Sequence, residues 1–247
     1  MPKRKSWIAI PFVFLLTAFI AASNGQNPKL PELRFDHIHT YSEVNIYLQN
    51  VIRVYPNITK LHKIGKSYLG KDLLVLEITN HATGKGLDKP GYWIDGCLHS
   101  GEVIGGEICL NTIQTLVTQN GRNPAITDLV DTRTFYIMPK LNPDGSDHYI
   151  TTPERVTSIV RPHDSDGDGQ LDEDPPEDLN GDGYVTAMRI RDKNGPLKTS
   201  SEDSRLMVPR GEDKGEWRVY TEGIDNDGDG RFNEDGVGGL NLNRNWP

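Results

Sequence analysis

The segment from Tyr92 to Val117 constrains the fold of this chain more than any other. A strand-like apolar stretch, Tyr92-Trp93-Ile94, leads into a glycine-containing turn, and a helix-like stretch leaves that turn at Val103. Arg133 to Met138 is again strand-like. The order strand, helix, strand predicts a right-handed parallel crossover within an α/β sheet. With 247 residues, 35% of them hydrophobic, the chain is long enough for one large globular domain.

His99 and Glu102 lie three residues apart on the turn between this strand and this helix. An imidazole and a carboxylate placed in this way can point at one cation. Histidine nitrogen and carboxylate oxygen are both ligands that Zn²⁺ accepts, so the pair predicts two ligands of a zinc site. Taken alone, the spacing also fits a histidine that caps the helix and a glutamate that complements its positive end.

Two later segments favour the metal interpretation. Asn142-Pro143-Asp144-Gly145 follows the strand that ends at Met138, and its residue types predict a tight turn. Near the end of the sequence stands Asn243-Arg244-Asn245, in which an arginine is flanked by two amides. A guanidinium can bind a carboxylate through two hydrogen bonds, although an ordinary surface ion pair would also use such an arginine.

The first part of the chain has clear local patterns. Thr40 and Glu43 form the capping-box pattern, and apolar residues at helical spacing follow it as far as Tyr55. Thr59–Tyr68 and Asp72–Thr79 predict an antiparallel hairpin with Leu69-Gly70-Lys71 as its turn. Residues 120–128 are expected to form a loop.

An acidic, glycine-rich insertion occupies about residues 160–236. Asp or Asn at positions one, three and five with Gly at position six is the beginning of a calcium loop, and three segments match it. The candidate calcium ligands are Asp164, Asp166, Asp168, Asp178, Asn180, Asp182, Asp225, Asp227 and Asp229. Position twelve holds Pro175, Arg189 and Gly236, so ordinary EF-hands are not expected. Calcium-stapled extracellular loops and a merely solvated acidic insertion both remain open.

The first 25 residues have the order of a secretory signal peptide. Lys3-Arg4-Lys5 precede an apolar stretch from Trp7 to Ile20, and small and polar residues follow it. An uncleaved anchor is the alternative. Cleavage would change the formal charge from −8 to −11, which disfavours nucleic acid and anionic membranes as partners. We therefore expect a secreted, periplasmic or extracellular protein. Export permits disulfides, but buried free thiols are favoured for Cys97 and Cys109.

The ordered set of these motifs resembles the carboxypeptidase A-like zinc carboxypeptidases. His99-Ser100-Gly101-Glu102, Pro139–Gly145 and Asn243–Trp246 occur in that family's order, and Gly65–Lys71 resembles its opening. The resemblance covers 35–145 and 237–247. It implies a mixed, largely parallel central sheet with helices on both faces, in which residues 30–247 form the N-terminal part of the catalytic domain and the sheet is incomplete at the C-terminus.

The resemblance also implies roles for residues. His99 and Glu102 would be the first two zinc ligands, and Asn243 and Arg244 would hold the C-terminal carboxylate of a peptide substrate. Arg161 is the candidate for polarising the scissile carbonyl. Arg155 and Arg189 compete for that role, because the insertion obscures the alignment. The implied reaction is hydrolysis of a C-terminal peptide bond.

The sequence departs from the family pattern after Asn243-Arg244-Asn245. A third zinc-binding histidine and a general-base glutamate are expected beyond Pro247, so we expect a fragment that alone binds zinc weakly and catalyses little. Two other functions stay open. One is a non-catalytic, calcium-stabilised secreted binding module, and the other is a related amidohydrolase acting on cell-wall peptides.

Overall fold

The computed structural model describes residues 29–246, and the predicted signal peptide lies outside them. No helix among these described residues is long and apolar enough to cross a membrane. The helices of the first part are α1 (Tyr41–Val54), η1 (His81–Thr83), η2 (Gly86–Asp88), α2 (Ile104–Gln119), α3 (Pro124–Thr132) and α4 (Pro143–Thr151). Its strands are β1 (Thr59–Lys66), β2 (Asp72–Ile78), β3 (Gly91–Asp95) and β4 (Thr134–Met138). The later part contains β5 (Ala187–Arg191), β6 (Leu197–Thr199), β7 (Met207–Pro209), β8 (Trp217–Thr221) and η3 (Leu242–Arg244).

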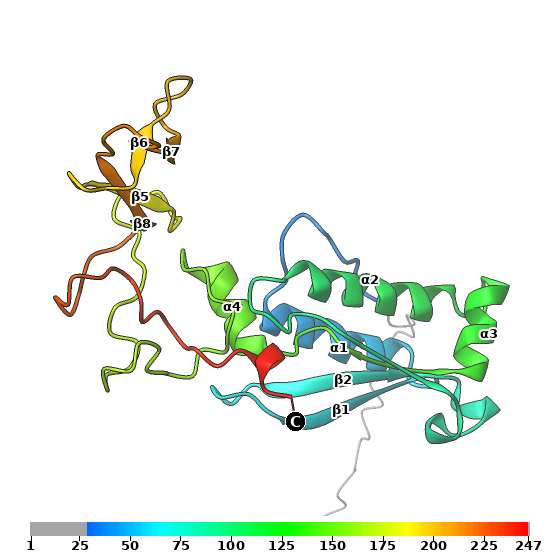
Figure 1. Cartoon of the computed structure of the whole chain (residues 1–247). Helices are drawn as coiled ribbons and strands as arrows, with labels where there is room; N and C mark the ends of the chain where they lie inside the picture. Colours follow the sequence, from blue (N-terminus) through cyan, green and yellow to red (C-terminus); the bar gives the residue numbers. More distant parts are fainter. Residues whose placement is uncertain (1–28, 247) are drawn as a thin grey trace, which may run out of the picture.

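A four-stranded mixed sheet in the order β1-β2-β4-β3 supports the first part (Figure 1). β3 and β4 are parallel, as the sequence predicted, and are joined through α2 and α3. The hairpin of β1 and β2 is also confirmed. The pairings β1–β2 and β2–β4 are antiparallel, so within the described residues the sheet is mixed α/β but not largely parallel.

One hydrophobic core lies between this sheet and the helices. Side chains of α1 and α2 form a single buried cluster with alternate residues of β2 and β4, including Leu76 and Ile137, which are fully buried. Alternate residues of a strand share one face of the sheet. The two longest helices therefore cover the same face of this sheet.

Local capping chemistry explains where several helices begin. The Thr40–Glu43 capping box of α1 is confirmed in full. Residues 120–128 were expected to be a loop, but α3 begins at Pro124, with the Asn123 side chain capping it. The predicted turn at residues 142–145 is likewise the start of α4, because Asn142 Oδ1 accepts a hydrogen bond from the Gly145 amide. Asn followed by Pro is a helix-start signal, and both segments carry it.

The acidic insertion contains a second, antiparallel sheet of order β5-β8-β6-β7, which stands apart from the first in Figure 1. Sequence analysis missed it because its strands have only three to five residues and lie between Gly-, Pro- and Asp-rich stretches. The alternation of apolar and charged residues in β5, Met188-Arg189-Ile190-Arg191, was its one visible signal in the sequence. The chain then returns from this sheet towards α4 (Figure 1).

Candidate metal centre

His99 and Glu102 meet on the turn that joins β3 to α2. His99 Nδ1 lies 2.8 Å from Glu102 Oε1. The histidine side chain is 18% exposed, whereas that of Glu102 is 66% exposed and reaches solvent. The other ring nitrogen, His99 Nε2, is buried and has no hydrogen-bond partner among the described residues.

These two residues fit a zinc ion. Zinc binds histidine nitrogen and carboxylate oxygen at about 2.0–2.2 Å, so two donor atoms 2.8 Å apart can share one ion. A buried, unpartnered ring nitrogen is costly without a ligand or a donor–acceptor partner. The pair therefore has the right donor types at the right separation through His99 Nδ1 and Glu102 Oε1. The unpartnered Nε2 is the other ring nitrogen and is not one of these two donors.

The turn is held tightly by backbone contacts. A Cβ on Gly96 would lie 2.4 Å from the Gly105 carbonyl carbon, so only glycine allows the turn to pass so close to α2. Cys97 has a φ of 57°, in the left-handed region, a strained feature that the sequence did not reveal. The amides of Glu102 and Gly105 then donate to the carbonyls three residues earlier.

The start of α4 lies directly beside this turn. The amides of Leu141 and Asn142 donate to the carbonyls of Gly96 and Cys97 at 2.9 and 3.0 Å. Asn142 Nδ2 donates to Ser100 Oγ at 3.1 Å, and both side chains are buried. Two motifs some forty residues apart in the sequence therefore form one structural unit.

A third segment packs next to the same unit. Ser158 O accepts hydrogen bonds from the side chains of Ser100 and Asn142. The Ile159 amide donates to Leu240 O at 3.1 Å, which aligns the segment before η3 with residues 156–160. A cavity of about 280 Å³ separates Leu242 from the start of α4. The structure thus brings the segment carrying Asn243 and Arg244 to the neighbourhood of α4.

The predicted carboxylate-binding residues are exposed. Arg244 Nη1 donates to Asn243 O at 2.9 Å, and Asn243 Oδ1 accepts from Trp246 Nε1 at 3.2 Å. Neither contact neutralises the Arg244 guanidinium. The charge therefore remains available to an anion.

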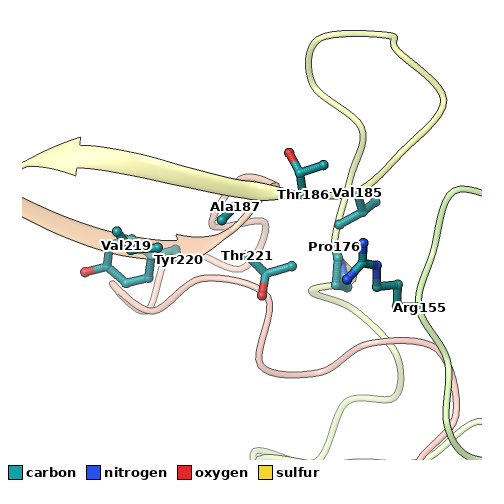
Figure 2. Close-up of a pocket in the computed structure, with 8 residues that line it drawn as sticks. All are labelled: Arg155, Pro176, Val185, Thr186, Ala187, Val219, Tyr220 and Thr221. Carbon is teal, nitrogen blue, oxygen red and sulfur yellow. The ribbon is translucent and has the colours of Figure 1, made fainter. Parts of the chain in front are cut away.

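The three arginines considered for the scissile carbonyl lie in different surroundings. Arg189 packs on the Trp217 ring, 4.8 Å from its centroid, and donates to Ser204 O within the insertion. Arg155 contributes to a cavity of about 640 Å³ whose wall includes Val185 and the ends of β5 and β8 (Figure 2). Arg161 is exposed.

Buried ionic contacts that sequence analysis missed support the centre. His39 Nδ1 lies 2.7 Å from Glu107 Oε2, which fixes the N-terminal segment to the first turn of α2. Asp144 accepts hydrogen bonds from Ser67 Oγ and the Leu69 amide, both at 2.9 Å. A charged residue inside an apolar helix, such as Glu107, was the available sequence signal.

Both cysteines are buried and free, as the sequence favoured. Burial raises the pKa of the Cys97 thiol and raises that of Cys109 to about 12. Neither thiol is therefore ionised at neutral pH, so neither has the charge of a thiolate metal ligand.

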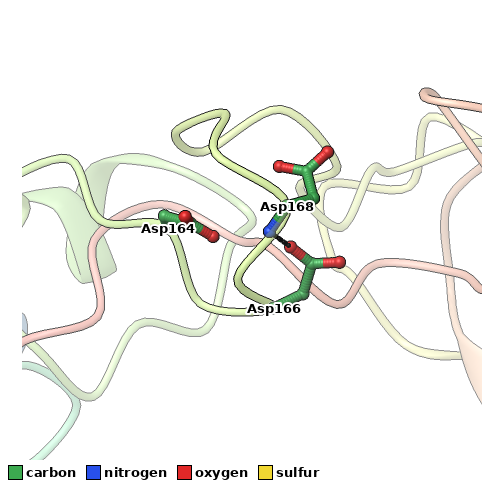
Figure 3. A group of neighbouring side chains, drawn as sticks. All are labelled: Asp164, Asp166 and Asp168. Carbon is green, nitrogen blue, oxygen red and sulfur yellow. Dashed lines mark hydrogen bonds between the residues drawn. The ribbon is translucent and has the colours of Figure 1, made fainter.

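The predicted calcium ligands lie together in the acidic loops, and further carboxylates lie beside them. In each of the three loops, the first aspartate accepts hydrogen bonds from the amides of the glycines three and five positions later, as for Asp164 in the first loop. Figure 3 shows that Asp166 and Asp168 follow Asp164 on one loop. Glu173, Asp174, Glu234 and Asp235 also join the acidic cluster, and sequence analysis missed all four.

Comparisons with known proteins identify the first part of the chain. It is 37% identical over 140 residues to human carboxypeptidase D, covering 57% of this chain, and 35% identical over 107 residues to mouse carboxypeptidase M, covering 43%. The matched regions span only 10% and 24% of the lengths of those two relatives. The crystal structure of carboxypeptidase A from Helicoverpa armigera aligns with a TM-score of 0.48 and 28% identity, over 57% of this chain and 33% of that chain.

The family profile described as zinc carboxypeptidase matches residues 44–175. This range includes the whole first sheet, His99, Glu102 and the start of α4. It also includes the first acidic loop and ends before the second sheet. Since the match covers more than half of the sequence, the chain belongs to the zinc carboxypeptidase family.

Proposed function

We propose that this protein is a zinc-dependent carboxypeptidase that removes the C-terminal residue from peptides. The observation that carries the proposal is the His99–Glu102 pair, with donor atoms 2.8 Å apart, on a turn fixed by the start of α4. His99 and Glu102 would hold the ion. When bound, zinc would polarise the scissile carbonyl and lower the pKa of its water towards about 7.

The remaining roles follow from the family resemblance. Arg244 and Asn243 would bind the C-terminal carboxylate of the substrate, and the exposed Arg244 guanidinium has the charge for this task. Arg161 would face the scissile carbonyl. A further histidine ligand and a proton-shuttling glutamate belong to the complete site in this proposal.

Export and calcium are parts of the same proposal. The charged, apolar and small-residue order of positions 1–25 supports secretion or transfer to the periplasm. The acidic insertion supports calcium as a second metal with a structural role. The expected partner is a peptide or protein with a free C-terminal carboxylate. We do not expect binding to nucleic acid, or to a membrane once the signal peptide is cleaved.

Zinc retention by the His99–Glu102 pair tests the assignment. After dialysis against a weak chelator, we expect Glu102→Gln to lower zinc affinity by about 100-fold or more, since loss of outer-shell partners alone costs roughly 10–100-fold. Bound zinc is measured by native mass spectrometry. The matched control is Glu212→Gln, an exposed carboxylate of the insertion, which should keep wild-type affinity. Equal zinc retention in both variants would sink the proposal.

A further inference from the structure

The acidic insertion contains an internal repeat. Asp164-Ser-Asp-Gly-Asp-Gly-Gln-Leu-Asp-Glu-Asp and Asp225-Asn-Asp-Gly-Asp-Gly-Arg-Phe-Asn-Glu-Asp have the same pattern of acidic, glycine and apolar positions. Their backbones match as well, because the ninth residues of the two segments, Asp172 and Asn233, have φ values of 51° and 61°. We call the segments 164–174 and 225–235 the first and second repeat loops.

The two repeat loops face each other across an approximate twofold axis. Asp174 and Asp235, the eleventh residues, form an antiparallel bridge. The Asn226 amide donates to Asp174 Oδ1 at 2.9 Å, and its counterpart, the Ser165 amide, donates to Asp235 Oδ1 at 3.0 Å. The last aspartate of each loop therefore accepts a hydrogen bond from the backbone amide of the second residue of the other loop.

This arrangement gathers carboxylates from both loops. Two symmetry-related groups each have their ligand oxygens within 4.8 Å of one another. The groups are Asp166, Glu173 and Asp235, and Asp227, Glu234 and Asp174. In each group, two carboxylates come from one loop and the third comes from the other.

A second pair of groups crosses the axis in the same way. Asp166 also lies within this distance of Asp229 and Glu234, and Asp227 lies within it of Asp168 and Glu173. Each third-position aspartate is therefore shared between ligands of both loops. A cation bound at one loop would contact the other loop as well.

Buried oxygens without partners point into this cluster. Asp235 is 0% exposed, and among the described residues its Oδ2 has no hydrogen-bond partner. Glu173 Oε2 and both carboxylate oxygens of Glu234 are buried and unpartnered in the same sense. Unpaired buried carboxylate oxygens are strongly unfavourable, and a metal ion is one of the few groups that satisfy several at once.

The chemistry of the cluster selects a hard divalent cation. All of the clustered donors are carboxylate oxygens, whereas zinc sites commonly use nitrogen or sulfur. Arg231 Nη1 lies 3.6 Å from Asp166 Oδ2, but the arginine side chain is 65% exposed.

Building on the calcium part of the proposed function, we propose that the two repeat loops form one paired site that binds two Ca²⁺ ions, each held by carboxylates from both loops. Calcium fits better than magnesium, because it accepts six to eight oxygens in irregular geometry. The glutamates at position ten and the aspartates at position eleven replace the acidic residue that an ordinary calcium loop has at position twelve. The loop at Asp178 has Ala187 and Met188 at those positions and is not part of the site.

Calcium titration of the whole, metal-stripped chain tests the proposal. By isothermal titration calorimetry we expect two Ca²⁺ per chain, with dissociation constants of about 10⁻⁵ to 10⁻³ M, and weaker binding of Mg²⁺. Calcium should also raise the melting temperature more than NaCl of equal ionic strength. Binding of no ion, or an equal rise with NaCl, would overturn the proposal.

A single substitution separates one shared site from two independent loops. Because Glu173 lies in groups that include Asp235 and Asp227, we expect Glu173→Gln to weaken the binding of both ions by about tenfold or more. Independent loops would lose one ion and keep the other unchanged, and that result would overturn the shared site. Asp178→Asn in the third loop is the matched control and should still bind two ions.

A second variant is available if Glu173→Gln does not fold without metal. Glu173→Asp retains the charge but has a shorter side chain, and it should weaken the binding of both ions in the same manner. Calcium binding is measured without any peptide substrate and without zinc. Failure of the calcium site therefore leaves the zinc proposal standing, and the reverse is also true.

Discussion

Arg244 is exposed, and its guanidinium donates a hydrogen bond to the carbonyl of its own neighbour, Asn243. A side chain held in this way is free to bind an anion, and a hydrogen bond to a charged group contributes about 1.5–3 kcal/mol. At the scale of single residues, the proposed recognition of a free C-terminus is therefore expected to depend on this one charge.

Arg244→Ala should weaken binding of a peptide with a free C-terminal carboxylate to the zinc-loaded protein by roughly 10- to 200-fold. The same substitution should leave binding of the C-terminally amidated peptide nearly unchanged. Fluorescence anisotropy with the two labelled peptides measures both constants. Arg205→Ala, in an exposed ion pair of the insertion, is the control. Equal losses for the free and the amidated peptide would contradict the role of Arg244.

At the scale of elements, the candidate metal centre depends on the crossing between the end of β3 and the start of α2. The Gly96 backbone passes so close to Gly105 and Gly106 that an added Cβ would fall within 2.6 Å of three of their backbone atoms. Backbone atoms cannot move aside as a flexible side chain can. The position of α2, and with it that of Glu102, is therefore tied to the absence of a side chain at Gly96.

We expect Gly96→Ala to lower the free energy of unfolding by about 1–3 kcal/mol, the usual cost of overpacking, and to weaken zinc binding because α2 must shift. Urea denaturation and zinc titration measure the two effects. Gly65→Ala in β1 is the matched control, since its Cβ would meet only the Leu73 side chain, at 3.5 Å. If Gly96→Ala is as stable as the wild type, the backbones of residue 96 and residues 105–106 have room for a Cβ, and the prediction is wrong.

At the scale of the whole molecule, Glu222 links the second sheet to the loop before it. It is buried directly after β8, and its carboxylate accepts hydrogen bonds from the amides of Leu179, Asn180 and Thr186 and from Thr186 Oγ1. The Thr186 donors lower the pKa of this carboxyl, so it is ionised at neutral pH. The Glu222 side chain thus holds residues 178–186 against the second sheet through these hydrogen bonds.

Glu222→Gln replaces one acceptor oxygen by a donor, and four hydrogen bonds cannot all be kept. We expect the amides of residues 178–186 to exchange with deuterium about tenfold faster or more, while those of β1, β2 and β4 keep their protection. Hydrogen exchange with mass spectrometry resolves the two regions. Glu216→Gln on the same segment should leave both unchanged. Equal acceleration throughout the chain would mean global destabilisation instead of local release.

The sequence alone determined the features that depend on neighbouring residues. The Thr40 capping box and the His99–Glu102 pair join residues three positions apart, and the hairpin of β1 and β2 joins residues at most 19 positions apart. Such contacts leave periodic and spacing signals that can be counted directly. The family resemblance followed from the order of those local motifs, and the family match confirmed it.

Only the tertiary structure decided which distant segments meet. The sequence does not show that Asn142 contacts Ser100, or that Glu173 of one repeat loop lies beside Asp235 of the other. These contacts join residues 42 and more positions apart, and each has only a small net effect on its own. Their geometry is fixed by the sum of burial, backbone pairing and charge across the fold, which no local pattern records.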